Sequence, residues 1–311
     1  SAAIGASTAF VEAALAQLYK EKDPLYSGYH GGPAYYIHSY AERVRKKKLK
    51  RSVIAVLFAL SGLICWGGIS QVISNSVASA FENAFGISPL VTTVVLVVIS
   101  AVIVMRKNAT VRALDVIVPI MAGCYFVIGV KRGLFSNEAG SGSAPCAAAA
   151  AEESDPVKVG LVQALGVFID TIVICSCTAM IMLLVPEELT TGLAGMDLLQ
   201  KVMSYYMGEF GVVFIAVTLA LFSFSTFLGI LFYARSNVAY LFGNRWIYQT
   251  LYKIFALIML FVGGLQAYTV VWDLGDVGVG LMTVFNLIVL FPLSGEALRA
   301  LKEYEEKKTN K

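Results

Sequence analysis

Charged side chains are scarce in this sequence. Aspartate, glutamate, lysine and arginine make up 14% of its 311 residues, while 58% are hydrophobic. Ordinary soluble domains carry about 25% charged residues, which keep their surfaces hydrated. At a mean hydropathy of +0.73, this chain has too few polar side chains to cover a core of its size. The shortage excludes an ordinary soluble domain and predicts an all-α, polytopic membrane protein.

Histidine and cysteine are too few and too scattered to indicate a metal centre or a disulfide framework. The two histidines, His30 and His38, lie in a polar stretch without matching ligands, and the five cysteines lie in or beside apolar runs. Buried thiols there behave as small hydrophobic groups. No nucleophile–base pair stands out, and a net charge of +3 is too small to suggest nucleic acid. We therefore expect no enzyme, no cofactor and no nucleic-acid partner.

What the chain does contain is a series of apolar runs close to the length of a membrane span, about 20 residues. The predicted spans and partial spans cover residues 1–19, 53–80, 88–105, 113–130, 139–151, 157–185, 211–234, 247–264 and 277–293. Residues 186–210 are mixed in polarity, so we expect an external loop that carries an amphipathic helix. The chain is thus predicted to be a single transmembrane domain, residues 1–311.

Basic residues alternate between loops, as they do when they mark the cytoplasmic side of a membrane. Residues 20–52 carry nine lysines and arginines, residues 81–87 carry none, and the tail from Arg299 carries five, which predicts a cytoplasmic C-terminus. The run "RVRKKKLKR" could also bind anionic lipid, but its role in topology is favoured. Lys131 and Arg132 break the pattern, because they fall where an external loop is expected.

The stretch "SNEAGSGSAP", residues 136–145, is polar and rich in glycine between two apolar runs. Gly140 and Gly142 permit an unwound backbone, and Ser136, Asn137 and Glu138 offer oxygens suited to sodium. Transporters place such interrupted helices near the membrane midplane to bind substrate and coupling ions. An ordinary turn outside the membrane, followed by a capped helix, fits the spacing equally well.

Three other intramembrane polar groups are candidates. Ser223, Ser225 and Thr226 in "LFSFSTFLG" could bind sodium, although such hydroxyls usually bond to their own or a neighbouring helix. Asp170 lies near the centre of its span, where an ionisable group is costly and is by default a functional hypothesis. It could couple ions or gate, or could instead bond to a neighbouring helix; Glu12 is comparable but nearer the end of its span.

The third group is the stripe formed by Gln71, Asn75 and Ser79, which share one helical face. It faces substrate or packs against another helix, and neighbouring small residues such as Gly67 and Gly68 fit the packing alternative.

At "RGLFSNEAGSGSAPCAAAAA" the sequence closely resembles the alanine or glycine:cation symporter family, and "GGPAYYI", "GVFIDTIVIC", "FSFSTFLG" and "WDLGDVGVGLMTVFNLIVL" agree with it in order. The resemblance covers nearly the whole chain. It implies uptake of alanine, glycine or a similar small amino acid, coupled to sodium or in some members to protons. It also implies the inverted-repeat fold of the leucine transporter, alternating access, and a bacterial or archaeal plasma membrane. We expect a monomer whose partners are amino acid, sodium and lipid.

The resemblance also implies roles for single residues. Phe135, Ser136, Asn137 and Gly140 would lie on the interrupted, substrate-binding helix. Thr226 matches a substrate-contacting threonine, and Ser225 with Thr226 matches a sodium site of that fold. Glu138 and Asp170 remain candidates for coupling or gating.

The chain departs from the family pattern in several places. Ile230 replaces a usual tryptophan, which implies a larger or reshaped pocket, and Gln71 is shifted two residues from the family's glutamine, which weakens its match. A first helix that would precede residue 1, and several dozen residues near 126–129, are expected from the family but are not in this sequence. The rival predictions are therefore a non-transporting fragment and a passive channel.

Overall fold

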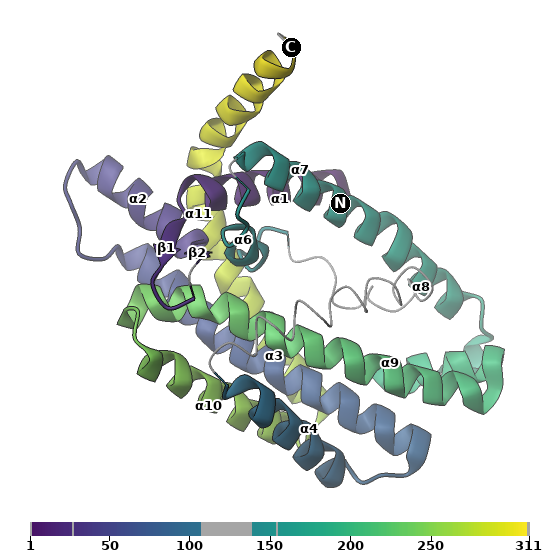
Figure 1. The fold of residues 1–311 in the computed structure, drawn as a ribbon. Coiled ribbons are helices and arrows are strands. Elements are labelled where there is room, and N and C mark those ends of the chain that lie inside the picture. The colour runs from purple at the N-terminus through teal and green to yellow at the C-terminus, as the bar shows by residue number, and fades with distance from the viewer. Residues whose placement is uncertain (1, 27, 107–138, 154, 310–311) are drawn as a thin grey trace.

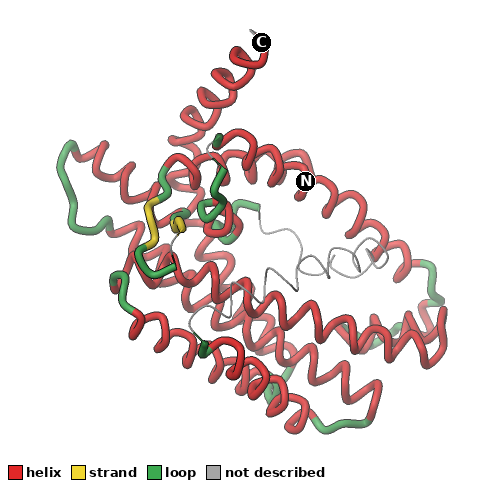
Figure 2. Tube along the Cα trace, viewed as in Figure 1, coloured by secondary structure: helices red, strands yellow, loops and turns green. Residues whose placement is uncertain are grey.

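The computed structural model describes residues 2–26, 28–106, 139–153 and 155–309. Helices dominate these residues (Figure 1, Figure 2). Five of them are long and apolar enough to cross a membrane, and two shorter apolar helices accompany them. The five are α3 (Val53–Phe85), the continuous run Pro156–Leu183, α9 (Gly195–Phe242), α10 (Trp246–Gly263) and α11 (Tyr268–Thr309); the shorter two are α1 (Ala2–Leu18) and α4 (Pro89–Val104).

The run Pro156–Leu183 consists of α7 (Pro156–Ile169), a π-helical turn at Asp170–Ile174, and α8 (Cys175–Leu183). The remaining elements are short: strands β1 (Glu21–Asp23) and β2 (Gly28–His30), helix α2 (Pro33–Arg45), helix α6 (Ala144–Ala148) and a 3₁₀ turn at Glu187–Leu189. The prediction of a mainly helical membrane protein is confirmed.

The helices pack around α3 and α9, which run side by side (Figure 1). Helices α10 and α4 lie on one side of this pair, and α1 with α7 on the other, while the C-terminal part of α11 projects away from the rest. The largest buried cluster joins α3, α9 and α11, and includes Trp66, Phe58, Leu228 and Met282. Helix α7 packs closely against α1 at Gly160. A Cβ atom at this position would lie 2.7 Å from the Phe10 ring, so the close approach depends on glycine.

Several predicted boundaries change in the structure. The span expected at 139–151 is replaced by a buried turn followed by the five-residue helix α6, because glycines at positive φ end the helical path. The span expected at 113–130 lies outside the described residues. The amphipathic helix expected within 186–210 is the start of α9, which continues into the next span after a break at Gly208 (φ 60°, ψ −151°).

Residues 20–52, which the pattern of basic residues assigned to a loop between two spans, instead contain two strands and the helix α2. β1 and β2 pair antiparallel, with Glu21 opposite His30 and Asp23 opposite Gly28. Ala34, Tyr36 and Ile37, at the start of α2, are fully buried in the main hydrophobic cluster. Seven of the nine basic residues in this stretch, from Arg43 to Arg51, follow the buried part of α2, while Lys20 and Lys22 precede it.

Candidate functional site

A cluster of buried polar side chains holds the turn that contains Gly140. The backbone N–H of Gly140 donates to Glu12 Oε2 of α1 at 2.9 Å. The amide nitrogen of Asn286 on α11 donates to Glu12 Oε1 at 2.5 Å and to the Gly140 carbonyl at 3.0 Å. The Tyr36 hydroxyl of α2 donates to Asn286 Oδ1. Glu12, Tyr36 and Asn286 are all 0% exposed, so three helices meet here on one stretch of main chain.

This stretch is irregular because of its glycines. Gly140 has φ 91° and Gly142 has φ 87°, a left-handed region that glycine enters without steric cost. The expectation of an unwound backbone is confirmed at both positions. Non-helical main chain within a membrane protein persists only where its N–H and C=O groups find partners. Glu12 and Asn286 supply those partners on both sides of Gly140.

The far end of the irregular segment is capped by α1. Gln17 donates to the Ala148 carbonyl, while Lys20 Nζ donates to the carbonyls of Ala151 at 2.9 Å and Glu153 at 3.1 Å. Gln17 thus satisfies the last carbonyl of α6, which has no partner within that helix, and Lys20 satisfies carbonyls of the chain that follows. Helix α1 therefore contacts the segment at both ends, through Glu12 and Gln17, and Lys20, two residues after α1, adds to the second contact.

We expect Lys20→Met to lower the free energy of unfolding by about 1–2 kcal/mol, because hydrogen bonds from a charged donor to partly buried carbonyls would be lost. Lys22→Met is the matched control, since Lys22 is exposed on the neighbouring strand. Denaturant titration of both variants in the same detergent measures the difference. Equal stability of the two variants would contradict the capping role.

The turn before α2 packs directly on the same segment. A Cβ atom added to Gly32 would lie 2.8 Å from Cys146 Sγ, and one added to Gly142 would lie 2.7 Å from the Pro33 ring. Gly32 also has φ 113°. The "GGP" at residues 31–33 thus lets two pieces of main chain approach more closely than side chains would permit.

The β-hairpin that precedes this turn is anchored to α9 by buried charges. Arg235 Nη2 lies 3.0 Å from Asp23 Oδ2 and donates to the Tyr29 carbonyl at 3.2 Å. Its guanidinium also stacks over the Tyr26 ring, 4.3 Å from the centroid. His30 Nδ1 lies 3.4 Å from the same carboxylate oxygen. His30 was expected in a polar stretch of the chain, but its side chain is only 2% exposed, because the hairpin folds over it.

These neighbours set the ionisation of Asp23. Burial raises the pKa of its carboxyl, but the His30 imidazole, the Arg235 charge and the Leu25 amide outweigh burial and hold that pKa below its ordinary value of 3.8. Asp23 is therefore ionised at neutral pH and serves as the counter-ion of Arg235.

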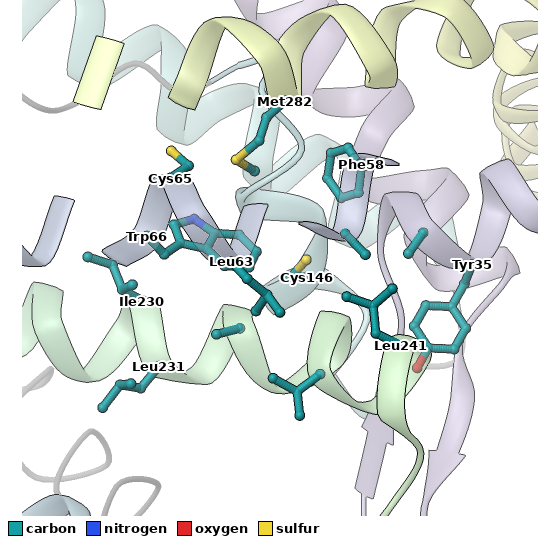
Figure 3. Packing of buried hydrophobic residues seen from close by; sticks show 14 of the residues in the cluster. Tyr35, Phe58, Leu63, Cys65, Trp66, Cys146, Ile230, Leu231, Leu241 and Met282 are labelled. Carbon is teal, nitrogen blue, oxygen red and sulfur yellow. The ribbon is translucent and has the colours of Figure 1, made fainter. Parts of the chain in front are cut away.

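The predicted sodium ligands lie together on α9. Ser223 and Ser225 are buried, at 7% exposure each, and Thr226 is half-buried. The Ser225 hydroxyl donates to the Phe222 carbonyl of its own helix at 2.8 Å. Ile230, at 3% exposure, lies near Trp66 of α3 in the main hydrophobic cluster (Figure 3).

Gln71 and Asn75 face α10 rather than the Gly140 turn. The Asn75 amide donates to the carbonyls of Gly263 at 3.3 Å and Gln266 at 2.8 Å, and Gln71 lies against Met259. These contacts correspond to the packing alternative, and a substrate role for the two residues stays a prediction.

The remaining candidates divide in two. Asp170 begins the π-helical turn and is only half-buried, whereas Glu12, which ranked below it by position in the sequence, is fully buried. Phe135, Ser136, Asn137 and Glu138 lie outside the described residues. Across the described ranges, His, Cys, Asp and Glu side chains form no group of three that could hold a metal ion.

Asn286 and Tyr36 were not among the residues predicted from the sequence, and Glu12 was placed below Asp170. The signal was present for two of them: Glu12 and Asn286 each interrupt an otherwise apolar helical run, "TAFVEAALA" and "TVFNLIVLF". A polar residue in such a run usually faces the interior of a bundle. Tyr36 could not be recognised as a buried partner of this cluster, because its segment was expected to be a loop.

Comparison with known proteins gives consistent matches along the chain. The model of the sodium:alanine symporter family matches residues 1–129 and 123–311. The amino-acid carrier protein AlsT of Bacillus subtilis is 34% identical over 350 residues, which covers 99% of this chain and 72% of that protein. The Probable sodium/glutamine symporter GlnT of the same organism is 36% identical over 348 residues, covering 99% and 71%. The sodium/alanine symporter AgcS of Methanococcus maripaludis is 30% identical over 355 residues, covering 100% and 77%.

Proposed function

The chain belongs to the sodium:alanine symporter family, a family of multi-pass membrane transporters, and on that premise we propose that it couples the uptake of alanine, glycine or a similar small amino acid to sodium. The observation that carries the proposal is the buried, left-handed turn at Gly140 and Gly142, inside a bundle of apolar helices. Transporters bind substrate and coupling ions at interruptions of this kind in their helices, near the middle of the membrane.

The proposed substrate site is this turn with the residues just before it. Phe135, Ser136, Asn137 and Gly140 would contact the amino acid, and Thr226 would contact it from α9. Glu12 and Asn286 already occupy the Gly140 N–H and carbonyl, so they shape the site rather than bind substrate. Access would alternate between the two sides of the membrane within a leucine-transporter-like fold, with the C-terminus in the cytoplasm of a bacterium or archaeon.

The proposed sodium site lies on α9. A hydroxyl has one proton to donate and two lone pairs to share. The Ser225 hydroxyl donates that proton to the Phe222 carbonyl, which leaves its oxygen free to face a cation, and Thr226 is the adjacent oxygen. Ser223 would complete the group from one turn away, and Glu138 or Asp170 would respond to the ion during gating.

Substrate size depends on the wall of the pocket. Ile230 is buried near Trp66 in the hydrophobic cluster, and its side chain is smaller than the tryptophan expected there from the family pattern. A relative named as a glutamine symporter lies at 36% identity, so we include glutamine with alanine and glycine among the substrates to be compared.

We also propose that this chain lacks an internal segment near residues 126–129. The family model matches in two pieces that meet at residues 123–129, and the alignments to the relatives span 348 to 355 positions, more than the 311 residues present. This supports a second candidate, a symporter fragment that keeps its fold but does not transport.

Uptake of radiolabelled alanine into proteoliposomes tests the function, with and without an inward sodium gradient. We expect uptake that requires the gradient, and a Thr226→Ala variant that loses about tenfold, because a hydrogen bond to a charged ligand is removed. Thr283→Ala is the matched control, since that hydroxyl bonds within its own helix to Val279.

The outcomes separate the alternatives. Uptake that does not depend on the sodium gradient indicates a passive channel. No uptake from this chain, but uptake once the family's internal segment is inserted near residue 126, indicates the fragment. Sodium-driven uptake that is the same in Thr226→Ala as in the unmodified chain would contradict the proposed site on α9.

A further inference from the structure

We propose that Glu12 is a proton-binding site that controls the turn at Gly140, an inference that rests on the function proposed above and adds a regulator to that site. Glu12 belongs to neither the proposed substrate contacts nor the proposed sodium ligands. It is nevertheless the fully buried carboxyl group whose two oxygens both contact N–H donors at the turn.

The donors and acceptors around Glu12 match an ionised carboxylate. An ionised carboxylate only accepts hydrogen bonds, and here both oxygens face N–H donors: Oε2 accepts from Gly140 N–H and Oε1 from the Asn286 amide. Asn286 cannot be turned around, because its oxygen accepts from Tyr36 and its second N–H donates to the Gly140 carbonyl. Tyr36, Asn286, Glu12 and Gly140 therefore form one chain with a fixed direction of donation.

Adding a proton breaks this arrangement. A proton from solvent that bonds to either Glu12 oxygen adds a donor to a carboxyl group that already faces the N–H donors of Gly140 and Asn286. It also removes the charge that strengthens both hydrogen bonds. Conversely, when the turn leaves Glu12, the buried carboxylate loses the Gly140 N–H, and a buried charge that loses a donor is costly unless it takes up a proton. Protonation of Glu12 and release of the turn therefore favour each other.

The groups that face Glu12 do not substitute for its charge. The titratable neighbours among the described residues are Tyr36 on α2 and Cys146 on α6, both neutral at physiological pH, and α11 contributes the neutral Asn286. On α7, which also packs against α1, Lys158 lies 3.5 Å from Glu153 and outside this cluster. Among the described residues of this cluster, the carboxyl of Glu12 is thus the group whose charge changes when a proton binds.

Cys146 offers a built-in reporter of the turn. It is 1% exposed, and its thiol lies 3.6 Å from the Gly142 carbonyl, two residues after Gly140. If the turn leaves Glu12, this thiol becomes reachable by a small maleimide. The full chain is reconstituted with the other four cysteines replaced by serine, and labelling is measured relative to the SDS-unfolded protein at the same pH, which cancels the pH dependence of the thiol itself.

We expect the labelling ratio to rise about tenfold when the pH falls from about 8 to about 5, the change that the loss of a charge-assisted hydrogen bond produces. In Glu12→Gln, whose amide nitrogen faces the same N–H donors as a protonated oxygen would, labelling should be high at every pH. Glu303→Gln, on the exposed end of α11, should behave as the unmodified chain. Tyr36→Phe keeps the carboxyl, so it should raise labelling but preserve the pH dependence.

Two results would overturn the proposal: labelling of the unmodified chain that does not change with pH, or a Glu12→Gln variant that keeps the same pH dependence. If Glu12→Gln does not fold, the unmodified chain and Tyr36→Phe still decide the question. Sodium-driven alanine uptake over the same pH range is the second readout, and it should lose its pH dependence in Glu12→Gln. Failure of uptake in every protein, with pH-dependent labelling intact, rejects the transport function but not the proton site.

Discussion

Replacing Gly142 by alanine is expected to destabilise the protein by about 2–5 kcal/mol. Two costs add. An alanine at φ 87° occupies the left-handed region at roughly 1–2 kcal/mol. Its Cβ would also lie 2.7 Å from the Pro33 ring and 2.8 Å from the Phe58 ring, and overpacking of this kind costs about 1–3 kcal/mol. Unfolding in detergent, followed by thermal or denaturant titration, measures the sum.

Gly166→Ala is the matched control for this substitution. Gly166 is in the helical run of α7, and a Cβ there meets nothing within 4 Å, so alanine should be neutral or slightly stabilising. Combining Gly142→Ala with Phe58→Leu isolates one part of the cost, because the smaller side chain relieves the collision with Phe58 but neither the collision with Pro33 nor the backbone strain. If Gly142→Ala were as stable as Gly166→Ala, the close packing of the turn against α2 and α3 would be refuted.

The membrane spans could be predicted from the sequence because a span depends on length and hydropathy alone. Helices α3, α4, α10 and the run Pro156–Leu183 begin and end within a few residues of their predicted bounds. The spans expected at 211–234 and 277–293 were placed well but too short, since α9 and α11 continue beyond the apolar run as amphipathic or charged helix. Apolar periodicity says nothing about where such a helix stops.

The start of α2 could not be predicted for a related reason. "GGPAYYI" carries glycine, proline and tyrosines beside a polybasic run, a composition typical of an exposed loop. In the structure, the glycines allow the main chain before α2 to approach Cys146 closely. Tyr36 can be buried because Asn286 accepts a hydrogen bond from its hydroxyl group. Both reasons depend on residues more than 100 positions away, which local composition does not contain.

The surroundings of the two carboxylates could not be predicted, for the same reason. Asp170 was preferred to Glu12 because it is nearer the middle of a span, but depth along one helix does not show which face of that helix is covered. Glu12 faces the Gly140 turn and Asn286, whereas Asp170 sits on a helical run with much of its surface exposed. The irregular glycine segment itself was predicted, since left-handed backbone needs glycine whatever surrounds it.

The second large effect is expected at the hairpin, where Asp23→Asn should cost about 3–5 kcal/mol. The side chains of Asp23 and Arg235 are 2% and 8% exposed, so removing the carboxylate leaves a buried guanidinium without its counter-ion. The hairpin leads directly into the "GGP" turn that packs on Gly142 and Cys146. We therefore expect the loss to appear both in denaturant unfolding and as faster maleimide labelling of Cys146.

The double variant Asp23→Asn with Arg235→Gln tests whether charge is the cause. It removes both charges and keeps polar side chains, so it should recover most of the loss, because replacing a whole buried pair costs far less than breaking it. Lys22→Asn is the control on the same strand. Acid provides an independent check: a carboxyl whose folded pKa lies below 3.8 contributes stability that is present above that value and is lost as the pH falls through the lowered pKa. The unmodified chain should therefore lose more stability than the double variant below about pH 4, and equal acid sensitivity of the two would show that the Asp23–Arg235 pair does not hold the hairpin to α9.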